Sequence, residues 1–159
     1  MEKENLNYLL TAHHADDNLE TILMRFIKGS SLKGYAGIMG KTLENGYNIY
    51  RPLLSLSKED IKEYAEEENL KYFTDASNSE DDYTRNRIRK YIVPLLLKEN
   101  PSLYQAVNTY SQTLLETSKM LEQQINNFVK KRVNVNNNII SFSVKDFLEE
   151  SEFFQIELL

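Results

Sequence analysis

The stretch from Leu9 to Arg25, LLTAHHADDNLETILMR, constrains the fold more than any other part of the chain. Tyr8 to Thr11 form a short, mostly apolar run that predicts a buried strand, whereas apolar residues from Leu19 onward recur at the spacing of an amphipathic helix. Two histidines and two aspartates lie between these segments. Residues that connect a strand to a helix lie at the edge of an open α/β sheet where such sheets bind ligands. The sequence therefore predicts an α/β domain with a site at this junction.

The composition limits the kinds of site that the chain can hold. It has 159 residues, of which 41% are hydrophobic, and no cysteine. The lack of cysteine excludes disulfides, thiolate metal sites, thiol nucleophiles and iron–sulfur clusters. No apolar run approaches the roughly 18 residues of a membrane span, and the first residues lack the layout of a secretory signal. We therefore expect a cytoplasmic protein with no membrane partner.

The segment after the first predicted helix contains all five glycines, from Gly29 to Gly46. Gly29 is expected to end the helix, because glycine readily adopts the conformation that terminates one. The concentration of glycines that follows favours a mobile loop. Asn45-Gly46 is typical of a hairpin turn, which predicts a second strand from Tyr47 to Arg51.

The rest of the chain predicts mostly helix. Ser57 and Asp60 form a capping pair that is typical of a helix start. We expect another helix from Tyr83, kinked or divided at Pro94, and a long one that begins at Pro101. The last part of the chain predicts a polar turn, a strand and a final helix, at residues 134–138, at residues 139–144 and from residue 143. The boundary between an α/β unit and a helical one is therefore expected at residues 99–101.

Two carboxylates of the first helix are candidates for chemistry. At 100° per residue, Asp17 and Glu20 share one face of the helix, which we expect to be exposed. Such a pair is suited to bind an ammonium group, hold a magnesium ion or accept a proton. Alternatively, Asp16 and Asp17 only cap the helix. Their negative charges then stabilise it by interacting with the positive end of its dipole, by about 0.3–1 kcal/mol each. Spacing alone does not decide between these roles.

His13 and His14 directly follow the predicted strand, so we expect one ring to face the site and the other to pack against the protein. The ring that faces the site is suited to contact a phosphate or a sugar. The alternative is a histidine that is hydrogen-bonded at the end of the strand. A zinc site is not expected, because no third ligand lies at a recognisable spacing.

Four of the six residues from Arg85 to Lys90 are basic. Arg85 and Arg89 can share a helical face, which Arg87 cannot join. Guanidinium groups suit phosphate or carboxylate contacts, although the net charge of −5 is a poor match to a protein that coats nucleic acid. The alternative is a solvated basic face that pairs with the acidic residues Glu80 to Asp82.

Several sequence blocks occur together in a fixed order: TAHHADDNLET, GSSLKG, RPLL, DASNSEDDYTRNRIR and IVPLL. Over Leu9 to Leu97, their order and spacing resemble the tRNA(Ile)-lysidine synthases, a family of N-type ATP pyrophosphatases. The resemblance implies an α/β fold, with a partial adenine-nucleotide alpha-hydrolase-like (Rossmann-like) domain followed by a mainly helical domain. Residues 1–99 would be the C-terminal half of the PP-loop ATP pyrophosphatase domain, and residues 100–159 a truncated tRNA-binding region.

The resemblance also implies a reaction, in which ATP with Mg²⁺ adenylates C2 of the cytidine at position 34 of tRNA(Ile) with a CAU anticodon. Free lysine then displaces AMP and forms lysidine, and the glycine-rich loop is expected to close over the activated intermediate. The residues expected to be catalytic and to bind lysine are Asp17, Glu20 and Arg85. Those expected to border ATP are His13 and His14. Those expected to bind RNA are Arg87, Arg89 and Lys90. No metal ligand is assigned.

One departure from the family is large. The family carries a phosphate-binding loop of the type SGGxDS, and no such sequence occurs here. We therefore expect the chain to be part of a larger enzyme, to be inactive alone, and to form a homodimer through exposed strands. Two alternatives are a related tRNA-modifying ATP pyrophosphatase, many of which depend on cysteine, and a non-catalytic module that binds RNA or a partner.

Overall fold

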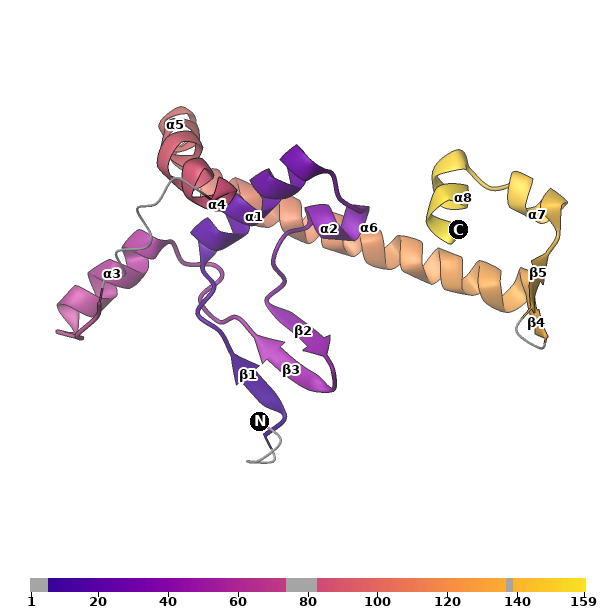
Figure 1. The fold of residues 1–159 in the computed structure, drawn as a ribbon, viewed down its shortest axis with the longest axis horizontal. Coiled ribbons are helices and arrows are strands. Elements are labelled where there is room, and N and C mark those ends of the chain that lie inside the picture. The colour runs from indigo at the N-terminus through magenta and orange to yellow at the C-terminus, as the bar shows by residue number, and fades with distance from the viewer. Residues whose placement is uncertain (1–5, 74–82, 137–138) are drawn as a thin grey trace. The chain divides into compact units, whose positions relative to one another are not determined.

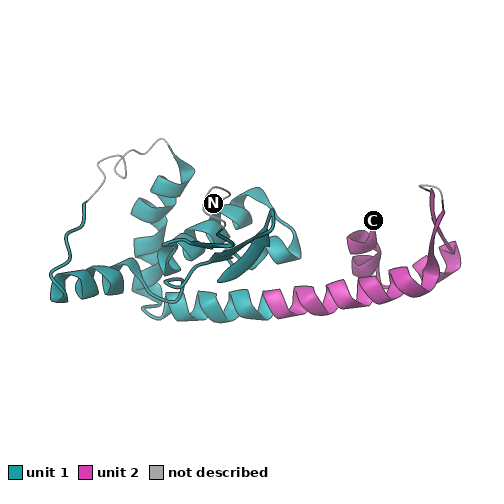
Figure 2. Cartoon of the chain, turned by 90° about the horizontal axis from the view of Figure 1, so that it is seen from below, with its two compact units in different colours: residues 1–114 teal, residues 115–159 magenta. Residues whose placement is uncertain are grey.

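The computed structural model describes residues 6–73, 83–136 and 139–159, and its fold is mixed α/β. The chain forms two compact units, residues 1–114 and residues 115–159, which are coloured teal and magenta in Figure 2. The units meet within a helix, later in the chain than the boundary expected at residues 99–101. The division into a catalytic part, residues 1–99, and a tRNA-binding part, residues 100–159, stays a prediction. No helix in the described ranges has the length and apolar character that a membrane span requires.

A small sheet begins the first unit (Figure 1). Its strands are β1 (Tyr8–Leu10), β2 (Lys41–Glu44) and β3 (Tyr47–Tyr50). The order is β1-β3-β2, with β1 parallel and β2 antiparallel to β3. The predicted hairpin is confirmed, because Asn45 and Gly46 take the positive φ angles of 51° and 81° that a tight hairpin turn requires.

The prediction that the first strand is buried is wrong for the described structure. The side chains of Tyr8 and Leu10 are 63% and 70% exposed. Among the described strands, β1 pairs only with β3, so one of its edges is not covered by another strand. The short apolar run thus identified the strand correctly and its burial incorrectly.

Helix α1 (Ala15–Lys28) has His14 as its N-cap and Gly29 as its C-cap. The φ of 80° at Gly29 confirms the predicted helix stop. The loop that follows contains a short helix, α2 (Leu32–Tyr35). It is tied back to α1, because the Arg25 guanidinium donates hydrogen bonds to the carbonyls of Gly34 and Gly37. The Asn18 side-chain oxygen also accepts the Ile38 N–H at 2.7 Å. The loop expected to be mobile is therefore hydrogen-bonded to the helix in this structure.

The predicted capping pair is confirmed at helix α3 (Lys58–Glu67), where Ser57 and Asp60 exchange side-chain and backbone hydrogen bonds. The next helical segment consists of α4 (Thr84–Arg87), a π-helical turn η3 (Ile88–Ile92) and α5 (Val93–Glu99). A kink or division of the helix is expected at Pro94, and the structure has this π-helical turn, which ends at Ile92, shortly before the proline. Proline lacks the N–H that would continue regular α-helical bonding.

The core of the first unit joins three helical segments. Leu19 of α1, Ile88 of η3 and Val93 of α5 are buried together. The start of α6 (Leu103–Arg132) packs against them through Leu103 and Val107. This packing explains why the first unit extends into α6.

The second unit is built on the end of α6. Its other elements are β4 (Val133–Asn136), β5 (Ile139–Phe142), α7 (Val144–Leu148) and α8 (Glu152–Leu158). The predicted strand and the helix capped by Ser143 are confirmed, except that Val144 belongs to the helix. The polar turn expected at residues 134–138 is wrong at its start, because residues 134–136 pair with β5, and residues 137–138 lie outside the described ranges.

We expect Ile88→Ala to lower the free energy of unfolding of the first unit by about 2–5 kcal/mol, because it leaves a cavity between helices. Ile88 is only 1% exposed. Chemical denaturation of both variants would measure the difference. The matched control is Leu95→Ala in the neighbouring helix, where the side chain is exposed. A loss for Ile88→Ala as small as that of Leu95→Ala would contradict the packing described.

Candidate functional site

The two candidate carboxylates lie on α1 but not on an exposed face. The Asp17 side chain is 16% exposed, and the Glu20 side chain is only 1% exposed. The expectation that both acids lie on the exposed side of the helix is therefore wrong for Glu20. The burial has a clear cause, since residues far along the chain cover this face of α1.

Two arginines cover the Glu20 carboxylate. The Arg89 guanidinium donates two hydrogen bonds to it, from Nε to Oε1 at 2.6 Å and from Nη2 to Oε2 at 2.9 Å. Arg85 Nε lies 3.5 Å from Glu20 Oε2, and Arg85 Nη2 donates to Thr21 Oγ1 at 2.9 Å. Arg85 and Arg89 thus share a face, as their spacing predicts. The interaction with Glu20 raises the pKa of Arg89.

The basic cluster does not form one continuous surface. Arg89 points at Glu20 and also lies 3.7 Å from Asp17, whereas Arg87 donates to Thr84 and the Lys90 ammonium lies over the Tyr91 ring. Arg87 and Lys90 are exposed, and Arg89 is largely engaged with carboxylates of α1. The alternative pairing with Glu80 to Asp82 lies outside the described residues.

The two histidines have different surroundings. His13 Nδ1 lies 2.9 Å from Thr11 Oγ1 at the end of the strand. The His14 ring lies between two carboxylates, with Nδ1 3.3 Å from Asp16 Oδ2 and Nε2 3.4 Å from Asp17 Oδ2. The interaction with Asp16 raises the pKa of His14 against the opposing effect of burial, and Asp17 and Glu20 add to the rise.

Asp16 has a larger role than sequence reasoning assigned to it. Its carboxylate accepts the Tyr104 hydroxyl at 2.6 Å and the Lys58 backbone N–H at 2.8 Å. Burial by itself raises the pKa of Asp16, but the adjacent His14 ring and the hydrogen bonds from Tyr104 and Lys58 outweigh it and hold that pKa well below its usual range. No sequence pattern pointed to this contact, because Tyr104 lies 88 positions further along the chain.

Two pockets adjoin this part of α1. One, of about 200 Å³, is lined by Arg25, Lys28 and Arg85 together with Thr21, Met24 and Gly29. The other, of about 350 Å³, lies beside Asp16 and Tyr104. Among the described residues, no group of three or more histidine, aspartate or glutamate side chains is placed to hold a metal ion.

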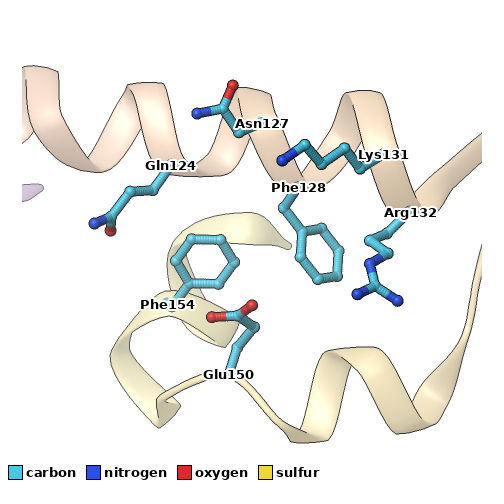
Figure 3. A pocket seen from close by; sticks show the side chains of 7 residues that line it. All are labelled: Gln124, Asn127, Phe128, Lys131, Arg132, Glu150 and Phe154. Carbon is cyan, nitrogen blue, oxygen red and sulfur yellow. The ribbon is translucent and has the colours of Figure 1, made fainter.

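The second unit has a pocket of its own, of about 350 Å³ (Figure 3). Phe128 of α6 and Phe154 of α8 form its apolar part, with ring centroids 5.7 Å apart. Polar and charged side chains complete its lining: Gln124, Asn127, Lys131, Arg132 and Glu150. Arg132 also pairs with Asp146 at 3.0 Å, which links α6 to α7.

Comparison with known proteins places the chain in a family. The model of the PP-loop domain matches residues 1–96, which include both candidate acids and both arginines. The chain therefore belongs to the PP-loop family. Over most of its length it is similar to tRNA(Ile)-lysidine synthases, as the order of its motifs predicts.

Three relatives illustrate the similarity. The tRNA(Ile)-lysidine synthase of Geobacillus kaustophilus is 41% identical over 149 residues, which cover 94% of this chain and 32% of the relative. The bifunctional protein TilS/HprT of Listeria innocua is 40% identical over 98% of this chain and 24% of its own length. The tRNA(Ile)-lysidine synthase of Bacillus cereus is 44% identical over 77% of this chain and 26% of its own length. The chain thus spans a third or less of each of these relatives.

We expect Glu20→Gln to lower the free energy of unfolding by about 2–3 kcal/mol, because it weakens the bonds of a buried carboxylate to two guanidinium groups. Denaturant unfolding, followed by circular dichroism, would measure the loss. Glu63→Gln, at an exposed glutamate of α3, is the matched control and should change stability by less than about 0.5 kcal/mol. Equal values for the two variants would show that the Glu20 ion pairs contribute nothing net.

Proposed function

We propose that the chain forms the lysine-receiving part of a tRNA(Ile)-lysidine synthase. The observation that carries the proposal is its 41% identity to such an enzyme over 94% of the chain. In the proposed reaction, ATP adenylates the C2 carbonyl oxygen of cytidine 34 in tRNA(Ile) with a CAU anticodon and releases pyrophosphate. The ε-amine of free lysine then attacks C2 and expels AMP, which gives lysidine.

The acidic side chains of α1 support this assignment chemically. Asp17 is part-exposed and can accept hydrogen bonds from the ammonium of lysine, which must lose a proton before it attacks. Glu20 is buried against Arg85 and Arg89, so its carboxylate helps to hold both guanidinium groups at the same site. Arg85, which lines the pocket beside Thr21, is then available to orient the substrate.

The remaining assignments follow the same proposal. His13 and His14 border the nucleotide, and the exposed Arg87 and Lys90, with Arg89 beside them, contact tRNA phosphates. The second unit contributes further tRNA contacts through its basic side chains. Mg²⁺ would neutralise the phosphates of ATP when bound, and no residue described here is assigned to hold it.

A chimera tests the proposal. The 149-residue aligned segment of the Geobacillus kaustophilus enzyme is replaced by this chain, and lysidine formation is assayed with ATP, lysine and a tRNA(Ile) transcript. We expect the chimera to form lysidine. A folded chimera that binds the tRNA but forms no lysidine would favour a non-catalytic RNA-binding module, and one that modifies the tRNA without lysine would favour a related pyrophosphatase.

In the active chimera, Asp17→Asn is expected to raise the KM for lysine about 10- to 100-fold, because one charged hydrogen bond to the ammonium is lost. The KM for ATP should change little. Glu20→Gln should also weaken lysine use more than ATP use, and Asp60→Asn, at an exposed helix cap, is the matched control for both. Equal losses in lysine and ATP use would mean that both acids support the fold and have no specific part in binding lysine.

A further inference from the structure

A series of hydrogen bonds and ion-pair contacts runs from α6 to Asp17. The Tyr104 hydroxyl donates to Asp16 Oδ1, and Asp16 Oδ2 lies 3.3 Å from His14 Nδ1. On the other side of the same ring, His14 Nε2 lies 3.4 Å from Asp17 Oδ2. Asp17 Oδ2 also accepts the His14 backbone N–H at 3.1 Å. The imidazole is thus placed to contact two carboxylates at once.

The carboxylate at the start of this series is held from two other elements. Tyr104 of α6 and the backbone N–H of Lys58 in α3 each donate to a different oxygen of Asp16. Both oxygens therefore have a fixed partner, which limits rotation of the carboxylate. The side chains of His14 and Asp16 are only 16% and 19% exposed, so water competes weakly for these contacts.

The charged groups around His14 favour a protonated ring. The groups of α1 that raise its pKa are the carboxylates of Asp16, Asp17 and Glu20. From the neighbouring elements come the guanidinium groups of Arg85 and Arg89, the hydroxyl of Tyr104 and the peptide N–H of Lys58. Three negative charges thus face two permanent positive charges, and a protonated His14 supplies a third positive charge.

We propose that Asp16 and Tyr104 are positioning residues that hold His14 as a protonated bridge to Asp17. Asp16 acts directly on the ring, and Tyr104 acts through Asp16. The raised pKa of His14 agrees with this geometry, since a cation between two carboxylates is favoured over a neutral ring. The bridge links helix α6 to a carboxylate that is a candidate for substrate binding.

One consequence rests on the proposed function. If Asp17 receives the ammonium of lysine, that ammonium supplies the positive charge that His14 supplies in the empty site. The two cations then compete for the same carboxylate, so bound lysine lowers the pKa of His14. Lysine binding would accordingly strengthen as the pH rises through the pKa of this histidine.

The bridge can be tested by NMR titration of the 159-residue chain, labelled in its two histidines. A His13→Gln variant assigns the His14 ring signals. We expect Asp16→Asn to lower the His14 pKa by about one unit, because the nearest anion becomes neutral. Tyr104→Phe keeps the aromatic ring, removes only the hydroxyl and should lower the same pKa by a smaller amount. The matched control, Asp60→Asn, should leave it unchanged.

These outcomes separate the bridge from the proposed function, because the titration needs neither ATP nor tRNA. An unchanged His14 pKa in a folded Asp16→Asn variant would overturn the bridge. If that variant does not fold, an unchanged pKa in Tyr104→Phe would overturn it as well. If added lysine leaves the His14 pKa unchanged while Asp16→Asn still lowers it, the proposed lysine site fails and the bridge stands.

Discussion

The buried carboxylate of Glu20 is the constraint on which the site depends. A carboxylate that is removed from water is costly unless charged donors replace the lost hydration. Arg89 supplies two such hydrogen bonds and Arg85 adds an ion pair at 3.5 Å, both from a segment that lies more than sixty positions further along the chain. Their pairing brings η3 against α1 and completes the core around Leu19 and Ile88. The same ion pairs that make the site polar therefore also help to assemble the helices around it.

Local patterns in the sequence predicted much of the fold. The Asn45-Gly46 hairpin, the helix stop at Gly29 and the Ser57 cap depend on the conformational preferences of a few neighbouring residues. Such preferences act in any context, so they can be recognised without knowing what surrounds them. The family, too, was identifiable from the order of short motifs, which the match to the PP-loop domain bears out.

Features set by distant contacts were beyond local reasoning. Helical spacing put Glu20 beside Asp17 but could not show that Arg89, 69 positions away, covers it. For the same reason Asp16 looked like a simple cap, although Tyr104 binds it from another helix. The strand β1 has an apolar sequence typical of burial, yet its exposure depends on which strands lie beside it. Burial and partner identity belong to the three-dimensional arrangement rather than to any one segment.

The π-helical turn at Ile88 to Ile92 affects which way the residues before and after it can face. A π-turn accommodates one more residue than an α-helical turn over the same path, so it behaves as a single-residue insertion within a helix. If the same residues instead formed regular α-helix, the extra residue would rotate Arg85 and Arg89 by about 100° relative to Val93. The arginines could then not face Glu20 while Val93 stays in the core. The π-helical turn is therefore favoured by charge and packing together, because it lets the arginines face Glu20 while Val93 stays buried.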